Sequence, residues 1–126
     1  MKKIKKIEDI KSYKDCCIVT GETPIDEDKL RLAGFLECEI ALRKIKTACK
    51  AANILNNNWK ADWSNPDQNK YYPWFAWRSS GFRSFDTYYT NTITSFGSQL
   101  CCGRREDMLH IMKLFEKEFV TFLKGE

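Results

Sequence analysis

The stretch that decides the fold is residues 26–58, DEDKLRLAGFLECEIALRKIKTACKAANILNNN. Its apolar side chains recur at three- and four-residue steps, which predicts one long amphipathic helix with a buried face. Acidic side chains come first and basic side chains follow, an order that counters the helix dipole, and three asparagines supply the stop. The apolar positions are Leu32, Phe35, Leu36, Ile40, Leu42, Ile45, Cys49, Ala52 and Leu55.

Two further helices are predicted on either side of this stretch. Ser12 is suited to cap the start of a short helix that ends at Gly21, where a left-handed residue is least costly. A closing helix is predicted over residues 105–123, because its apolar residues again fall at helical steps. These residues are Leu109, Met112, Phe115, Phe119 and Phe122.

Residues 59–96 differ from the rest of the chain, because they hold 12 of its 17 aromatic residues and only seven charges. Turn signals divide this part into strand candidates at 71–77, 82–89 and 96–102, and Pro73 favours an edge or a bulge. We therefore predict an α+β fold. Its antiparallel meander of about three strands would pack against the long helix and the C-terminal helix.

Length and composition favour one domain spanning residues 1–126, with a basic N-terminal segment at 1–11. The Lys-rich start lacks an apolar stretch, and no run of about 18 apolar residues occurs, so we expect a cytosolic protein with no membrane partner. The six cysteines include two adjacent pairs, which bridge poorly, and we expect reduced, mostly buried thiols.

No catalytic pattern is found in the sequence. His110 is the single histidine, and neither a phosphate-binding glycine loop nor a Cys-x-x-Cys pair occurs. We therefore expect a protein that is not an enzyme and that needs no cofactor or metal.

Aromatic rings and cations interleave between residues 59 and 83, a combination that suits the bases and phosphates of nucleotides. For each ring, packing in the core is the competing interpretation, and Tyr71 and Tyr72 cannot both be inside if they lie on one strand. The candidate ligand-binding residues in this part are Trp63, Lys70, Tyr71, Tyr72, Trp74, Arg78 and Arg83.

Two other groups of cations stand out. Arg104 and Arg105 lie at the start of the closing helix, where they either receive a phosphate or pair with Glu106 and Asp107, and we add both arginines to the candidates. Residues 43–50 hold four cations and no acid, which we interpret as the solvated face of the long helix. These cations are Arg43, Lys44, Lys46 and Lys50.

Four short motifs carry a resemblance to a known family. They are Trp-Lys-Ala-Asp-Trp at 59–63, Lys-Tyr-Tyr-Pro-Trp-Phe at 70–75, Ser-Gly-Phe at 80–82 and Gly-Ser-Gln-Leu-Cys at 97–101. With them, the chain resembles an uncharacterised family of small proteins from phages and prophages of gut bacteria. The resemblance implies a phage-encoded accessory protein that binds a host or nucleic-acid component and brings no known activity.

The sequence thus supports two functional hypotheses. The first is a non-enzymatic protein that binds a phosphate-bearing ligand, either a nucleotide, for instance as a sponge for a host signalling nucleotide, or single-stranded nucleic acid. The second is a structural or protein-interaction role through an aromatic patch, in the virion or on a host factor. A homodimer is the default expectation for its assembly.

Overall fold

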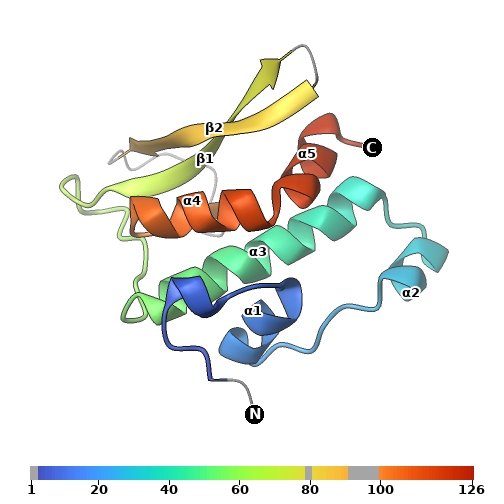
Figure 1. The fold of residues 1–126 in the computed structure, drawn as a ribbon, viewed down its shortest axis with the longest axis horizontal. Helices are drawn as coiled ribbons and strands as arrows, with labels where there is room; N and C mark the ends of the chain where they lie inside the picture. The colour runs from blue at the N-terminus through green and yellow to red at the C-terminus, as the bar shows by residue number, and fades with distance from the viewer. Residues whose placement is uncertain (1–2, 79–80, 91–99) are drawn as a thin grey trace.

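The computed structural model describes residues 3–78, 81–90 and 100–126 (Figure 1). A two-stranded hairpin lies on the two C-terminal helices, these lie on the longest helix, α3, and α1 packs against the other side of α3 (Figure 1). The elements in chain order are η1 (Ile7–Asp9), α1 (Tyr13–Thr20), α2 (Glu27–Leu32), α3 (Glu37–Leu55), β1 (Lys70–Arg78), β2 (Gly81–Thr90), α4 (Arg105–Leu114) and α5 (Glu116–Lys124).

The predicted three-stranded meander packed on helices is wrong, because the described chain is mostly helical. Its sheet has two antiparallel strands, paired from Lys70 with Thr90 to Arg78 with Gly81. Residues 91–99, with the predicted turn and most of the third strand, lie outside the described residues. Cys102, at the end of the predicted third strand, makes one isolated β-bridge to Tyr71 and is fully buried. It is therefore a core residue.

The predicted long helix is also wrong in its first third, because the chain breaks between α2 and α3. Gly34 has a φ of 94°, a left-handed conformation that cannot continue a right-handed helix. A separate helix, α3, begins after Leu36, and the Glu39 carboxylate caps its start by accepting a hydrogen bond from the Leu36 amide at 3.2 Å. The stop at the asparagines is confirmed, since Asn57 and Asn58 have φ values of 54° and 55°.

Helix α1 is confirmed with both of its predicted ends. The Ser12 hydroxyl accepts from the Asp15 amide at 3.3 Å, and Gly21 closes the helix with a φ of 76°. The closing helix, in contrast, is divided into α4 and α5 at Phe115. The strand irregularity expected near Pro73 is present as a register shift between Trp74 and Phe75.

The core joins α1, α3, α4 and α5, and it also includes part of the basic N-terminal segment. Ile7 and Ile10 are 3% and 0% exposed, and His110 of α4 donates a hydrogen bond to the Ile10 carbonyl at 2.8 Å. The N-terminal segment therefore packs against the core, which its lysine-rich sequence did not indicate. The central side chains of the cluster are Cys16, Ile45, Ala48, Cys49, Ala52, Cys102, Met108, Ile111, Met112, Phe115 and Phe119.

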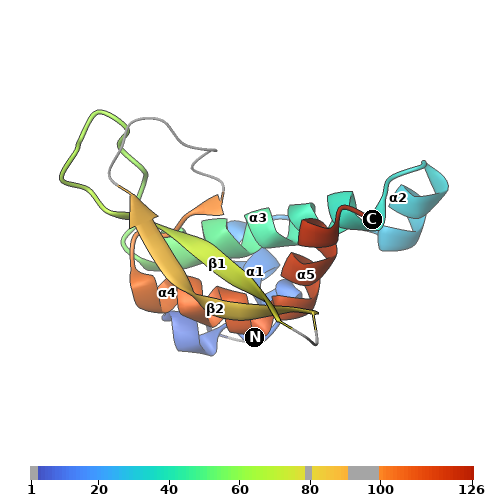
Figure 2. The same ribbon diagram turned by 90° about the horizontal axis from the view of Figure 1, so that it is seen from above.

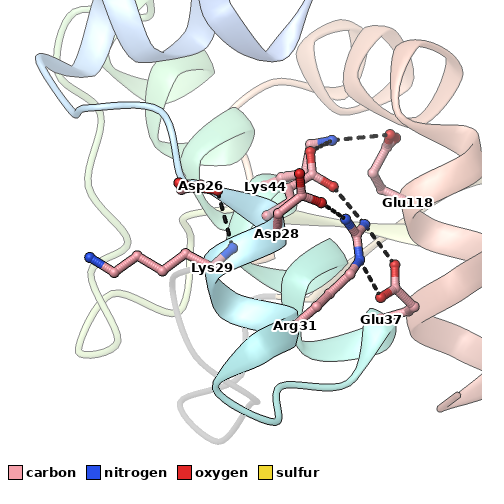
Figure 3. Close-up of polar contacts among 8 residues, drawn as sticks. Asp26, Asp28, Lys29, Arg31, Glu37, Lys44 and Glu118 are labelled. Carbon is pink, nitrogen blue, oxygen red and sulfur yellow. Dashed lines mark hydrogen bonds and ion pairs between the residues drawn. The ribbon is translucent and has the colours of Figure 1, made fainter.

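Helix α2 lies at one end of the molecule, where ion pairs fasten it to its neighbours (Figures 2 and 3). Arg31 contacts Glu27, Asp28 and Glu37 at 2.7–3.1 Å. Lys44 of α3 continues the network, because it reaches Glu27 at 3.3 Å and Glu118 of α5 at 3.9 Å (Figure 3).

All six cysteines are free thiols, and all except Cys38 are buried, which confirms their prediction as small core residues. Within the described ranges, no helix is long and apolar enough to cross a membrane.

Candidate functional site

A cavity of about 600 Å³ runs along one side of α3. Six α3 residues line it at three- and four-residue steps, so they form a single stripe on the helix. They are Arg43, Lys46, Thr47, Lys50, Asn53 and Ile54. We refer to this cavity as the α3 groove. Its remaining walls come from α1, from the connector before α2 and from the loop after α3, through Tyr13, Glu22, Thr23, Ile25, Asn58, Trp59, Lys60 and Ala61.

Tyr13 holds the connector that forms one wall of the groove. Its hydroxyl accepts a hydrogen bond from the Ile25 amide at 3.2 Å, and the Glu22 amide donates to the Thr20 hydroxyl at 3.3 Å. Burial raises the pKa of Tyr13 to about 12, so its hydroxyl is neutral at physiological pH. The connector wall therefore rests on a neutral, partly buried phenol.

Trp59 forms the end wall and is braced from two directions. Its amide donates to the Asn53 and Asn56 carbonyls at 3.0 Å, because the left-handed Asn57 and Asn58 turn the chain back onto α3. Its ring lies on Gly103, where a Cβ atom would come within 2.6 Å of the indole carbons Cγ and Cδ2. Only glycine at position 103 allows this approach.

Asn53 connects the groove to the segment before α4. Its side-chain amide donates to the Cys101 carbonyl at 2.9 Å, and its side-chain oxygen accepts from the Gly103 amide at 3.2 Å. The same residue's backbone carbonyl accepts from Trp59. Asn53, Gly103 and Trp59 thus form one hydrogen-bonded and closely packed end of the groove.

The groove is positively charged, because its lining includes four basic residues and one acid. Lys50 lies near that acid, with 4.0 Å between its Nζ and the Glu22 carboxylate. Among the described residues, Lys46 and Lys60 have no ion-pair partner, and the Arg43 guanidinium lies 5.1 Å from the centre of the Phe35 ring. The ammonium groups of Lys46 and Lys60 are therefore available to bind an anion.

The side chains that line the groove are mainly cationic, polar and aromatic. Its described lining includes no histidine or cysteine, and the Thr47 hydroxyl already donates to the Arg43 carbonyl at 3.2 Å. No group of three or more metal ligands occurs in the described part of the chain. Cations beside an indole ring suit a ligand that combines phosphate with a flat ring.

Lys70 and Trp63, two of the predicted binding residues, are brought together, but they serve the fold. Lys70 is 0% exposed, and its ammonium donates to the Gln68 and Asn65 carbonyls at 3.1 and 3.4 Å. The same ammonium lies 5.1 Å from the centre of the half-buried Trp63 ring. The charge is thus satisfied inside the loop that precedes β1.

The three predicted rings of β1 lie in three different environments. Tyr72 is buried, Tyr71 is half-buried and bridged to Cys102, and Trp74 is 48% exposed. Trp74 borders an apolar hollow of about 230 Å³ between β1 and α5. The rings therefore do not form one continuous stacking surface.

The two predicted arginines at the start of α4 differ from each other. Arg104 donates to both oxygens of the Asp107 carboxylate, at 2.9 and 3.1 Å, so it forms the pairing interaction. Asp107 is 0% exposed, and burial raises the pKa of its carboxyl although Arg104 opposes the shift. Arg105 is exposed. The side chains of Arg78 and Arg83 lie outside the described part, so their role in ligand binding stays a prediction.

The sequence shows the groove residues as a basic stretch and as part of an aromatic pattern, but it does not identify them as a binding site. The acid-free basic stretch at 43–50 was interpreted as a solvated helix face, and Trp59 and Lys60 entered only through the aromatic pattern. The sequence did not reveal that the connector after Gly21 and the loop after Asn58 flank that face. With these two walls, the basic face of α3 lines a groove.

Comparison with known proteins adds no relative to this description. No family model, curated protein or solved structure matches the chain. Inference about function therefore rests on the chemistry of the α3 groove and its surroundings.

Proposed function

We propose that this protein binds a phosphate-bearing ligand, a nucleotide or a short piece of single-stranded nucleic acid, in the α3 groove and performs no reaction on it. One observation carries the proposal: a groove of about 600 Å³ has a row of cations along one wall and the braced Trp59 ring at its end. The residues that make these contacts are Arg43, Lys46, Lys50, Trp59 and Lys60.

Two interactions would hold such a ligand. Charge-assisted hydrogen bonds from lysine or arginine to phosphate contribute about 1.5–3 kcal/mol each. Stacking of one base on an aromatic ring adds about 1–3 kcal/mol. Because Trp59 is already fixed by Asn53 and Gly103, little side-chain entropy is lost when a base stacks on it.

The hairpin region offers weaker support for phosphate binding. Lys70 donates to backbone carbonyls and Arg104 to Asp107, so a phosphate would have to displace both sets of hydrogen bonds. We therefore propose the groove as the site where phosphate is bound. The resemblance to small phage proteins fits an accessory role in the host cytosol, and sequestering a host signalling nucleotide is one form of that role.

The proposal is tested with Lys46→Ala combined with Lys50→Ala. The matched control is Lys113→Ala combined with Lys117→Ala, which removes the same charge from exposed positions on α4 and α5. Calorimetry against a panel of linear and cyclic nucleotides and short oligonucleotides should show at least a tenfold weaker affinity for the groove variant alone. Binding should also weaken as salt is raised.

Two results would contradict the proposal. The first is no binding heat from any phosphate-bearing ligand with the unaltered protein. The second is an equal loss of affinity in the groove variant and in the control, which would show that only net charge matters.

A protein-interaction role is the second candidate, and Trp74 favours it. This ring is 48% exposed beside Leu123, which is 43% exposed, at the rim of the apolar hollow. Tryptophan is enriched at the energetic centres of interfaces. If a homodimer forms through this surface, Trp74→Ala should convert it to a monomer in light scattering, and a dimer that persists in this variant would reject the surface.

A further inference from the structure

We infer that the ligand of the α3 groove is a single nucleotide with a chain of two or more phosphates. Its base lies at Trp59 and its phosphates extend along α3 toward Arg43. This inference rests on the proposed function, and it adds the ligand class and the direction of binding.

The order of groups along the groove gives the direction. The Trp59 ring lies on Gly103, whose amide donates to the Asn53 side chain, so the ring end of the groove lies near residue 53. With the rise of an α-helix, Lys50 lies about 4.5 Å from this level along the axis, Lys46 about 10.5 Å and Arg43 about 15 Å. An aromatic ring is thus followed by three cations in a row.

A nucleoside polyphosphate has the same linear order, with its base at one end and successive phosphates beyond the sugar. A single phosphate next to the sugar would reach the cation nearest to the ring, Lys50. A second and a third phosphate would reach Lys46 and then Arg43. Arg43 suits the terminal phosphate, because a guanidinium can donate two parallel hydrogen bonds to its oxygens.

The rings around the groove favour one nucleotide over an oligonucleotide. Single strands are held by a ring for each of several successive bases. Among the described lining residues, the Tyr13 ring already faces the Lys44 ammonium at 5.5 Å. In the described part of the groove, Trp59 is the lining aromatic ring with no cation over it.

The size of the cavity agrees with this ligand class. About 600 Å³ falls within the roughly 300–1,000 Å³ that small-ligand pockets occupy. Lys46 is half-buried near the middle of the row, where a phosphate would be partly shielded from water. An anion bound there is screened less by salt than one at an open surface.

The test compares adenosine with its mono-, di- and triphosphate, and with inorganic tripolyphosphate, in a metal chelator. Tryptophan fluorescence and calorimetry measure the affinity of each probe for the full chain. We expect the affinity to rise roughly tenfold with each added phosphate. Tripolyphosphate should bind more weakly than the triphosphate nucleotide, because it lacks the base that stacks on Trp59.

Single variants locate each phosphate. Arg43→Ala should reduce the affinity of the triphosphate to about that of the diphosphate and leave the monophosphate unchanged. Lys50→Ala should weaken all three nucleotides by a similar factor. Both positions are exposed, so folding is retained, and Lys113→Ala serves as the control that leaves every affinity unchanged.

The outcomes separate this inference from the function on which it rests. Equal affinity for one, two and three phosphates, with Lys50→Ala still weakening each, overturns the inference and leaves the proposed function standing. A short oligonucleotide that binds more tightly than the triphosphate, and that is weakened by the same variants, would also overturn the inference and leave the proposed function standing. Absence of binding by every phosphate probe and oligonucleotide overturns both.

Discussion

The α3 groove and the start of β1 carry the same kinds of side chain, but the structure uses them differently. At β1, the Lys70 ammonium is 0% exposed and donates to backbone carbonyls beside the Trp63 ring. In the groove, Lys46 has no ion-pair partner in the described chain and lines a cavity that ends at Trp59. A cation beside a ring is therefore structural when its donors are satisfied within the chain, and it is available to a ligand when they are not.

The largest expected effect follows from Lys70→Ala, which should destabilise the fold. The substitution removes a buried side chain together with charged hydrogen bonds to the Gln68 and Asn65 carbonyls. We expect the free energy of unfolding in urea to fall by about 2–4 kcal/mol. A change of less than about 0.5 kcal/mol would mean that Lys70 is as dispensable to folding as a surface lysine.

Gly103→Ala should come next, and it tests the brace behind Trp59. A Cβ atom at this position would lie 2.6 Å from the indole ring, so the ring must shift, at a cost of about 1–3 kcal/mol. The affinity for a nucleotide should fall as well, because the shifted ring no longer presents the same surface.

A double-mutant cycle controls for other effects of this substitution. In a Trp59→Ala background, Gly103→Ala should cost much less, because the clashing partner is gone. Equal costs in both backgrounds, measured by urea unfolding, would show that the strain lies elsewhere.

Two thiols near α3, those of Cys16 and Cys101, are buried, which should make stability fall at alkaline pH. Burial raises the pKa of the Cys16 thiol to about 12 and that of Cys101 to about 11, above an ordinary value of 9.0. Below pH 9 these thiols are neutral in both the folded and the unfolded state, so their contribution to stability is fully present. As the pH rises toward 11, the unfolded state alone releases their protons.

Each such thiol should lower the free energy of unfolding by up to about 1.4 kcal/mol per pH unit in that window. Urea unfolding between pH 8 and 10.5 measures the slope, and Cys16→Ala should make it shallower. A free energy of unfolding that stays constant over this range would show that the thiols are not buried away from water in the folded state.

The groove lysines should matter much less to folding than Lys70 does. Lys46→Ala combined with Lys50→Ala should change the free energy of unfolding by less than about 1 kcal/mol, since the contact between Lys50 and Glu22 is long and exposed. Thermal or urea unfolding checks this directly. If the double variant loses as much stability as Lys70→Ala, the groove cations are structural and the contrast between the two regions fails.

The smallest effect is expected at Arg31. Its ion pairs with Glu27, Asp28 and Glu37 are exposed, so Arg31→Ala should leave global stability nearly unchanged (Figure 3). Amide exchange should become faster in α2 alone, and high salt should have a similar effect on the unaltered protein. Faster exchange throughout α3 would show that the network supports more than the end of the molecule.

The sequence predicted elements where a local signal was sufficient. Ser12 and Gly21 fixed both ends of α1, and the asparagines after Leu55 fixed the end of α3. The break at Gly34 was not predicted from the sequence, because the pattern of apolar residues continues across it. Whether a glycine adopts a left-handed conformation depends on tertiary contacts, here including the ion pairs that hold α2.

The site was harder to predict, because it depends on pairing and on the segments that flank α3. Lys70 and Lys46 are both lysines near aromatic residues, and the sequence does not state that one meets backbone carbonyls and the other meets solvent. From the sequence, Arg104 can bind either a phosphate or an acidic neighbour, and in the structure its partner is the Asp107 carboxylate. The folding of the connector and the loop after Asn58 against α3 creates the groove, and this arrangement is a long-range property.

The most direct test of the account maps the bound ligand onto the backbone amides. A titration of the ¹⁵N-labelled protein with adenosine triphosphate should shift the amide resonances of residues 22–25, 46–54 and 58–61, which surround the α3 groove. The amides of residues 68–74 and 104–107 should shift little. Saturating shifts concentrated at Lys70, Trp74 and Arg104, with the groove amides unmoved, would contradict the claim that the α3 groove is the binding site.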